Sequence, residues 1–137
     1  FFYYLNGLVF KLNKNDFTAS VSYSPKSKGN IFIPRSINNN DQKFIVISIG
    51  NGSFKNNANI NSVLISDDSE LKIIHKNAFL STKISSIVIP PKLEKLEDGG
   101  VKELRIYSML RYIQTTKTLP ILAHTLTSLQ NAVCIVL

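Results

Sequence analysis

Residues 58–66 read ANINSVLIS, and residues 82–90 read TKISSIVIP, a close copy of the first string. The apolar positions around these strings also recur in the same order. The first copy holds Val46, Ile49, Phe54, Ile60, Val63 and Ile65, and the second holds Leu71, Ile74, Phe79, Ile84, Ile87 and Ile89. Each position of the first copy is separated from its counterpart in the second by the same number of residues up to the phenylalanine. After the phenylalanine this separation is again constant but one residue shorter. Self-similarity at a period of about 20–50 residues is typical of a solenoid, and this repeat falls within that range.

Each copy contains two short extended segments. In the first copy Val63 and Ile65 alternate with polar or outward positions, which is the period of a strand with one buried face. The L-x-x-I segment at 71–74 predicts a second short strand on the opposite wall of the coil. One unit cannot bury its apolar face alone, so the copies must stack with like strands side by side and parallel.

Two partial copies frame these units. Upstream, GNIFIP at 29–34 matches the second strand and its proline, and the polar insertion RSINNNDQK at 35–43 follows it. Downstream, Val101, Leu104 and Ile106 repeat the strand pattern sooner than a full repeat would place it, and Gly99-Gly100 replaces the phenylalanine segment. Residues 30–107 are therefore predicted to form about four repeats, the last of them shortened.

The two ends of the chain differ from the repeats. Residues 1–29 carry extended runs with the hairpin signal Asn6-Gly7 between the first two, which predicts an N-terminal β-hairpin cap over the first coil. Residues 108–137 are expected to be a C-terminal cap or tail. Apolar residues spaced as on one face of a helix predict a helix over 121–134; they are Leu122, Leu126, Leu129 and Val133.

The composition fits one globular domain over residues 1–137, with 44% hydrophobic and 18% charged residues. The net charge is +7, but the lysines are scattered without a basic stripe, which argues against nucleic acid and leaves acidic glycans or anionic surfaces as an alternative partner. The single Cys134 excludes an intrachain disulfide and a multi-cysteine zinc site. Polar residues interrupt the apolar stretch 119–137, so we expect no membrane span there.

The stretch LKIIHKNAFLSTKISSIVIPPKLEKL at 71–96 resembles the BspA-like leucine-rich repeat family, whose pattern is L-x-x-I-x-x-x-A-F-x-x-x-x-I-x-x-I-x-I-P. The resemblance extends over about residues 17–107. It implies an α/β, β-rich leucine-rich-repeat solenoid with a right-handed coil and a parallel sheet on one wall. It also implies a cell-surface or secreted protein that binds other proteins or extracellular matrix and does no catalysis. We expect any signal peptide to lie upstream of Phe1.

Residues that could carry chemistry are few, and no cofactor is predicted. His75 corresponds to Gly50 of the previous copy and is interpreted as a rim histidine, and His124 as a packing residue of the predicted helix. The acidic stretch SDDSE at 66–70 lacks the ligand spacing of an EF-hand calcium loop and favours a turn. GNG at 50–52 lacks the third glycine of a dinucleotide site and is also read as a turn.

The outward face of the parallel sheet is the surface that the sequence favours for binding. Stacking places equivalent positions about 4.8 Å apart in rows. One row contains Phe32, Leu64, Val88 and Arg105, and the next contains Asn30, Ser62, Ser86 and Glu103. An apolar row with a polar edge is typical of a protein contact. The alternative is that these residues only reflect the preference of strands for β-branched and aromatic side chains.

Overall fold

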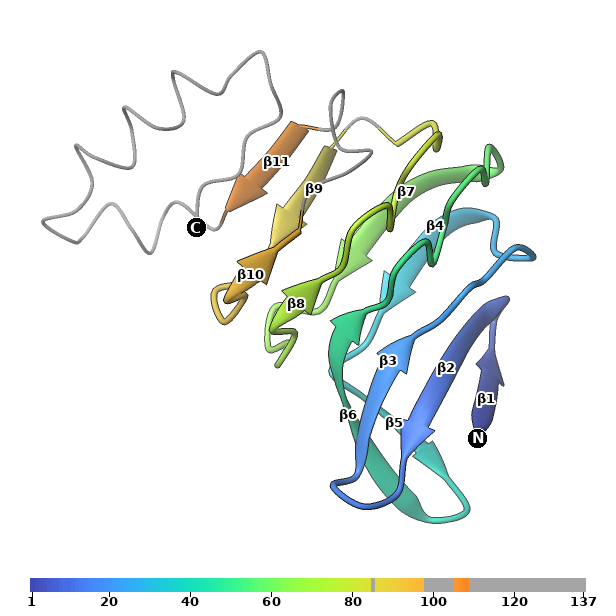
Figure 1. The fold of residues 1–137 in the computed structure, drawn as a ribbon, viewed down its shortest axis with the longest axis vertical. Helices are drawn as coiled ribbons and strands as arrows, with labels where there is room; N and C mark the ends of the chain where they lie inside the picture. The colour runs from blue at the N-terminus through green and yellow to red at the C-terminus, as the bar shows by residue number, and fades with distance from the viewer. Residues whose placement is uncertain (85, 98–104, 109–137) are drawn as a thin grey trace, which may run out of the picture.

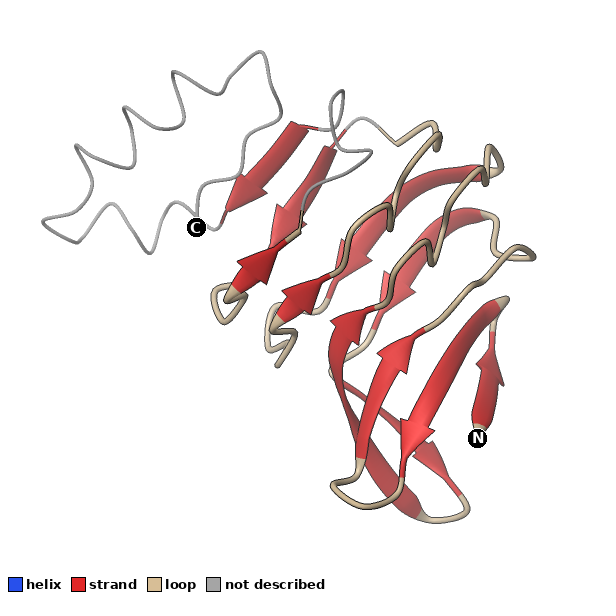
Figure 2. Cartoon of the chain, in the orientation of Figure 1, coloured by secondary structure: helices blue, strands red, loops and turns tan. Residues whose placement is uncertain are grey.

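A computed structural model describes residues 1–84 and 86–97 and the backbone of residues 105–108. The strands are β1 (Phe2–Leu5), β2 (Leu8–Asn13), β3 (Thr18–Val21), β4 (Gly29–Ile33), β5 (Ser36–Asn39), β6 (Gln42–Ile49), β7 (Ile60–Ile65), β8 (Ile73–Ile74), β9 (Ser86–Ile89), β10 (Lys95–Leu96) and β11 (Arg105–Ser108). The described residues form strands, turns and loops, with no helix among them (Figure 2). The helix predicted over 121–134 lies outside the described residues, as do His124 and Cys134.

The N-terminal hairpin is confirmed. Strands β1 and β2 pair antiparallel, with Leu5 opposite Leu8 and Asn6-Gly7 at the turn. Both turn residues have a positive φ, 51° and 83°, as a two-residue type I′ turn requires. Strand β2 then pairs antiparallel with β3, so the hairpin continues directly into the first strand of the coils.

Two walls of parallel strands make up the coils (Figure 1). In the first, which we call wall A, β3, β6, β8 and β10 follow one another in parallel ladders. In the second, wall B, β4 pairs with β7 and β9 pairs with β11, all parallel, and β9 lies beside β7. Like strands of successive coils are therefore neighbours, as the repeat predicts.

The register of the walls reproduces the repeat spacing. Between β6 and β8, Ser48 pairs with Ile73 and Ile49 with Ile74, which is the offset that the sequence repeat shows. Between β8 and β10 the offset is shorter, with Ile74 opposite Leu96. All twelve apolar positions of the two copies are buried, and they belong to one continuous hydrophobic core. The interior is thus shared between the coils.

A third segment of each coil joins the two walls, and it also stacks. Phe54 and Phe79 are buried with ring centroids 5.5 Å apart and ring planes 12° apart. Beside them, the Phe54 N–H donates to Ala78 O at 2.8 Å. Backbone conformation repeats as well, because Gly52 and Asn77, which occupy equivalent positions of successive coils, have φ values of 65° and 61°. The phenylalanines therefore form a stacked column inside the solenoid.

The polar insertion at 35–43 forms a hairpin that the sequence interpretation missed. Strand β5 pairs antiparallel with the first half of β6, with Asn39 opposite Gln42. Asn40 and Asp41 form the turn with φ values of 49° and 62°. Asparagine and aspartate tolerate this left-handed conformation better than other non-glycine residues, so this pair was the signal for a hairpin turn.

The predicted register of the last coil is wrong. The sequence pattern placed Leu104 opposite Ile87, whereas in the structure Ile106 pairs with Ile87. Because side chains alternate with a period of two, a shift from Leu104 to Ile106 preserves the alternating pattern. The apolar pattern alone could not distinguish the two registers.

Candidate functional site

An exposed apolar row crosses wall B. Phe32, Leu64 and Val88 are 52%, 58% and 47% exposed, and we call these three residues the apolar row. Strand alternation produces it, since the neighbours of each residue in the strand point into the core and are buried. The ladder between β4 and β7 places Phe32 directly opposite Leu64. The predicted exposure of these three side chains is confirmed.

A polar row borders the apolar row on the same face. Asn30, Ser62 and Ser86 are exposed, and Asn30 pairs with Ser62 across the β4–β7 ladder. The Ser62 hydroxyl donates to Asn30 Oδ1 at 2.9 Å, which fixes both side chains. These neutral groups offer hydrogen bonds to a partner without a large cost of removing charge from water.

Arg105, one of the two charged residues predicted for these rows, does not occupy the expected place. Arg105 is in register with Ser86, so it belongs to the polar row, and Tyr107 is the residue in register with Val88. This follows from the shifted register of β11. Glu103 lies outside the described residues.

Ion pairs join the loops that follow three successive strands of wall B. Arg35, after β4, lies 3.2 Å from Glu70 Oε1, and Lys92, after β9, donates to the same oxygen at 2.7 Å. The hydrogen bond from Lys92 lowers the pKa of Glu70 below its ordinary value of 4.5. Nearby, the Ser66 hydroxyl donates to Asp68 Oδ1 within the SDDSE turn. The acidic stretch forms a turn, as predicted, and two of its carboxylates, Asp68 and Glu70, have basic partners.

His75 lies at the rim of wall A, as predicted. Its Nδ1 is 3.2 Å from Glu97 Oε2, and the backbone N–H of Lys76 donates to the same oxygen at 3.1 Å. The backbone hydrogen bond from Lys76 is the main reason that the pKa of Glu97 lies below 4.5. No group of three or more His, Cys, Asp or Glu residues in the described part of the chain is placed to hold a metal ion.

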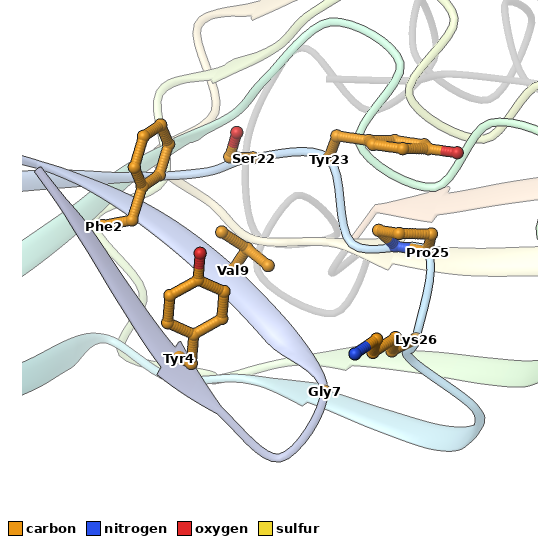
Figure 3. Close-up of a pocket in the computed structure, with 8 residues that line it drawn as sticks. All are labelled: Phe2, Tyr4, Gly7, Val9, Ser22, Tyr23, Pro25 and Lys26. Atoms are coloured by element: carbon orange, nitrogen blue, oxygen red, sulfur yellow. The ribbon is translucent and has the colours of Figure 1, made fainter.

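A second surface, the aromatic groove, was not found from the sequence. It has a volume of about 450 Å³ and lies on the outer face of the N-terminal strands, between Phe2 and Tyr4 on one side and Tyr23 on the other, with Lys26 at one end (Figure 3). The three rings are each more than half exposed. The signal was the run FFYY at 1–4, because alternation along β1 sends Phe2 and Tyr4 outward while Tyr3 and Leu5 pack against the core.

Comparison with known proteins gives a fold but no close relative. No family model and no curated protein matches the chain. A leucine-rich repeat protein from Bacteroides capillosus superposes with a TM-score of 0.50 at 20% sequence identity, over 78% of this chain and 97% of that one. The chain has a leucine-rich-repeat fold. The predicted fold class is thereby confirmed for the described strands.

A second solved structure is similar at a lower level. A leucine rich cell surface protein from Faecalibacterium prausnitzii matches with a TM-score of 0.48 and 18% identity, over 77% of this chain and 35% of that chain. This leucine-rich-repeat chain therefore spans about a third of that protein's length. Within the residues that the structure describes, no helix is long and apolar enough to cross a membrane.

Proposed function

We propose that this leucine-rich-repeat chain is a non-enzymatic module that binds a protein or extracellular-matrix ligand through wall B, at the cell surface or after secretion. The observation that carries the proposal is the apolar row, which exposes three large side chains on neighbouring strands of wall B. Apolar side chains at the centre with polar groups at the edge are the usual arrangement of a protein interface.

The energy available from the row sets the kind of complex it can form. Burying an exposed side chain of this size is worth about 1.5–3 kcal/mol, so covering what is exposed of Leu64 contributes about 1 kcal/mol. The three residues together contribute about 3–4 kcal/mol, which is too little for tight binding by themselves. A partner must also contact the polar row, where Asn30 and Ser62 present fixed hydrogen-bonding groups.

Wall B also suits binding because its shape is held in place. The buried faces of β4, β7 and β9 share one core, and Glu70 links the loops after these strands through Arg35 and Lys92. A surface that is already ordered loses little conformational entropy when a partner binds. The surface location and the absence of catalysis rest on the resemblance of residues 17–107 to the BspA-like family.

Substitution of Leu64 by lysine tests this function. The partner is captured from an extracellular-matrix extract on the immobilised chain, identified, and its affinity then measured for each variant. Leu64→Lys should weaken binding at least tenfold and leave the thermal midpoint unchanged, because Leu64 is 58% exposed. Phe1→Lys is the matched control, since it adds the same charge at a similarly exposed apolar position, 54%, outside both wall B and the aromatic groove. Equal affinity of Leu64→Lys and the wild type would refute the role of the apolar row.

A second candidate function, adhesion to sulfated or other acidic glycans, is favoured by the aromatic groove. Its rings can stack on the apolar face of a sugar, and Lys26 can pair with an acidic group. Residues 1–34 carry four lysines and one aspartate, so this end of the chain is basic. Under this function a heparin column retains the chain until about 0.3 M salt, and Tyr23→Ala and Lys26→Ala shorten retention. If neither change shortened retention, the aromatic groove would be excluded as the glycan-binding site.

A further inference from the structure

Strand β4 is the first strand of wall B, and one of its edges is open. Its other edge pairs with β7, and within the described residues no other strand pairs with it. Beside the open edge lies a groove of about 500 Å³ bounded by β4, the β1–β2 hairpin and β5, which we call the strand groove. Its lining includes Tyr3 and Leu5 from the hairpin and Lys28, Asn30 and Phe32 from the β4 segment.

The hydrogen bonds of β4 show which backbone groups face the strand groove. The Gly29 N–H donates to Asn59 O at 2.8 Å, and Ile33 O accepts from the Ser66 N–H at 3.0 Å. The backbone N–H and C=O groups of Gly29 and Ile33 therefore point toward β7. In a strand, the N–H and C=O groups of successive residues point to opposite edges. The backbone groups of Asn30 and Phe32 therefore face away from β7. No hydrogen bond between described residues uses them.

Open backbone edges recruit other strands because each exposed N–H and C=O can continue the ladder. Donors and acceptors two residues apart on an extended strand, about 6.6–6.8 Å, match the spacing of another extended chain. A partner helix cannot satisfy them, since its own backbone groups are already bonded within the helix. The geometry of this edge thus specifies an extended peptide.

The lining of the strand groove adds a preference for charge. Lys28, just before β4, is exposed, and it is the charged residue among the described residues that line the groove. No carboxylate from these residues opposes it. A peptide with an acidic side chain near Lys28 is favoured, and an apolar side chain four positions along can lie against Phe32.

We propose that an extended, acidic segment of a partner protein binds in the strand groove as an additional strand of wall B, with hydrogen bonds to the backbone of Asn30 and Phe32. This binding mode rests on the proposed protein-binding function and specifies one way of performing it. The added strand continues the row of exposed side chains beyond Phe32, so the strand groove and the apolar row form one continuous surface.

A pair of peptides tests the proposal. The probe is a fluorescent seven-residue peptide of threonines with one glutamate and, four positions along, one valine, and its control carries N-methyl groups on three consecutive central residues. Side chains are identical, but the three central residues of the control cannot donate backbone hydrogen bonds toward either edge. The unmodified peptide should bind at least tenfold more tightly, since each lost hydrogen bond weakens binding by roughly fivefold to tenfold. Equal affinities, or no binding of the unmodified peptide up to 5 mM, would overturn the proposal.

A pair of variants locates the site. Asn30→Pro removes the outward N–H and fills the edge, whereas Asn30→Ala loses the same hydrogen bond to Ser62 but keeps the N–H. Asn30→Pro should weaken peptide binding at least tenfold relative to Asn30→Ala. If Asn30→Pro does not fold, Phe32→Pro and Phe32→Ala form a second pair at the other outward position. Equal binding within the folded pair would refute the open edge as the site.

The same assay separates this inference from the function on which it rests. Leu64 is on β7, one strand away from the open edge. Leu64→Lys should therefore leave the affinity of the short peptide within twofold of the wild type, although it weakens the whole partner. A loss of peptide binding in Leu64→Lys as large as in Asn30→Pro would show that the peptide lies on the face of wall B and not at its edge.

Discussion

Truncation of Phe79 to alanine should destabilise the chain more than any change on its surface. The Phe79 ring is 3% exposed and stacks on Phe54 at 5.5 Å between centroids. Replacing a buried phenylalanine by alanine costs about 3–5 kcal/mol in lost burial and in the cavity left behind. The ring pair contributes about 0.5–1.5 kcal/mol of this beyond the buried area. Native domains of this size have about 5–15 kcal/mol in total, so a large share of the stability should be lost.

Urea unfolding followed by circular dichroism measures this effect. With a slope of about 2 kcal/mol per molar urea, the midpoint should fall by about 1.5–2.5 M. Phe32→Ala is the control, since that ring is 52% exposed and the loss of its buried part should cost only about 1 kcal/mol. In a double-mutant cycle with Phe54→Ala, the two losses should be less than additive, by about 0.5–1.5 kcal/mol. A Phe79→Ala midpoint equal to that of Phe32→Ala would refute a stacked phenylalanine column.

Two further changes test contacts between coils. Gly50→Ala should lower the free energy of unfolding by about 1–3 kcal/mol, because a Cβ there would lie 2.8 Å from Val21 O. A loss below about 0.5 kcal/mol would show that this carbonyl can move aside. Glu97→Gln tests the carboxylate bound by the Lys76 N–H, whose pKa is lowered in the folded chain. Its ionised form stabilises the fold above pH 4.5, and that stabilisation is lost as the pH falls through the folded-state pKa. The difference in urea midpoint between Glu97→Gln and wild type should thus shrink below pH 4.5, and a constant difference down to about pH 3 would contradict this role.

The repeat predicted most of the fold because its apolar positions indicate which side chains are buried. The apolar positions recur at fixed spacing, and a solenoid is the arrangement in which such units bury one another. This sufficed to place Phe54 beside Phe79 and Val63 on a strand next to that of Ile87. It also predicted that Leu64 is exposed, since alternation along a strand assigns every side chain to one face.

Features that do not depend on burial were harder to predict. The β5–β6 hairpin is specified by the left-handed backbone of Asn40 and Asp41, which leaves no apolar pattern. The alternating apolar pattern fits two registers of β11, and the predicted partner of Arg105 was therefore wrong. The aromatic groove forms between Tyr4 and Tyr23, which come from separate strands and loops, and only the folded cap brings them together. Local periodicity in the sequence does not indicate which residues of separate segments lie close together in the fold.

Disulfide trapping across wall B tests the central claim, which is that equivalent positions of successive coils stand side by side. In a background with Cys134→Ser, Phe32→Cys and Leu64→Cys should form a disulfide rapidly under mild oxidation, because these paired positions lie on adjacent strands about 4.8 Å apart. Phe32→Cys with Ser62→Cys is the control, since this diagonal pair is about 8 Å apart, beyond disulfide reach. Mass spectrometry without reduction should find the first bond and little of the second. Equal yields of the two, or a higher yield for the diagonal pair, would contradict the stacked register.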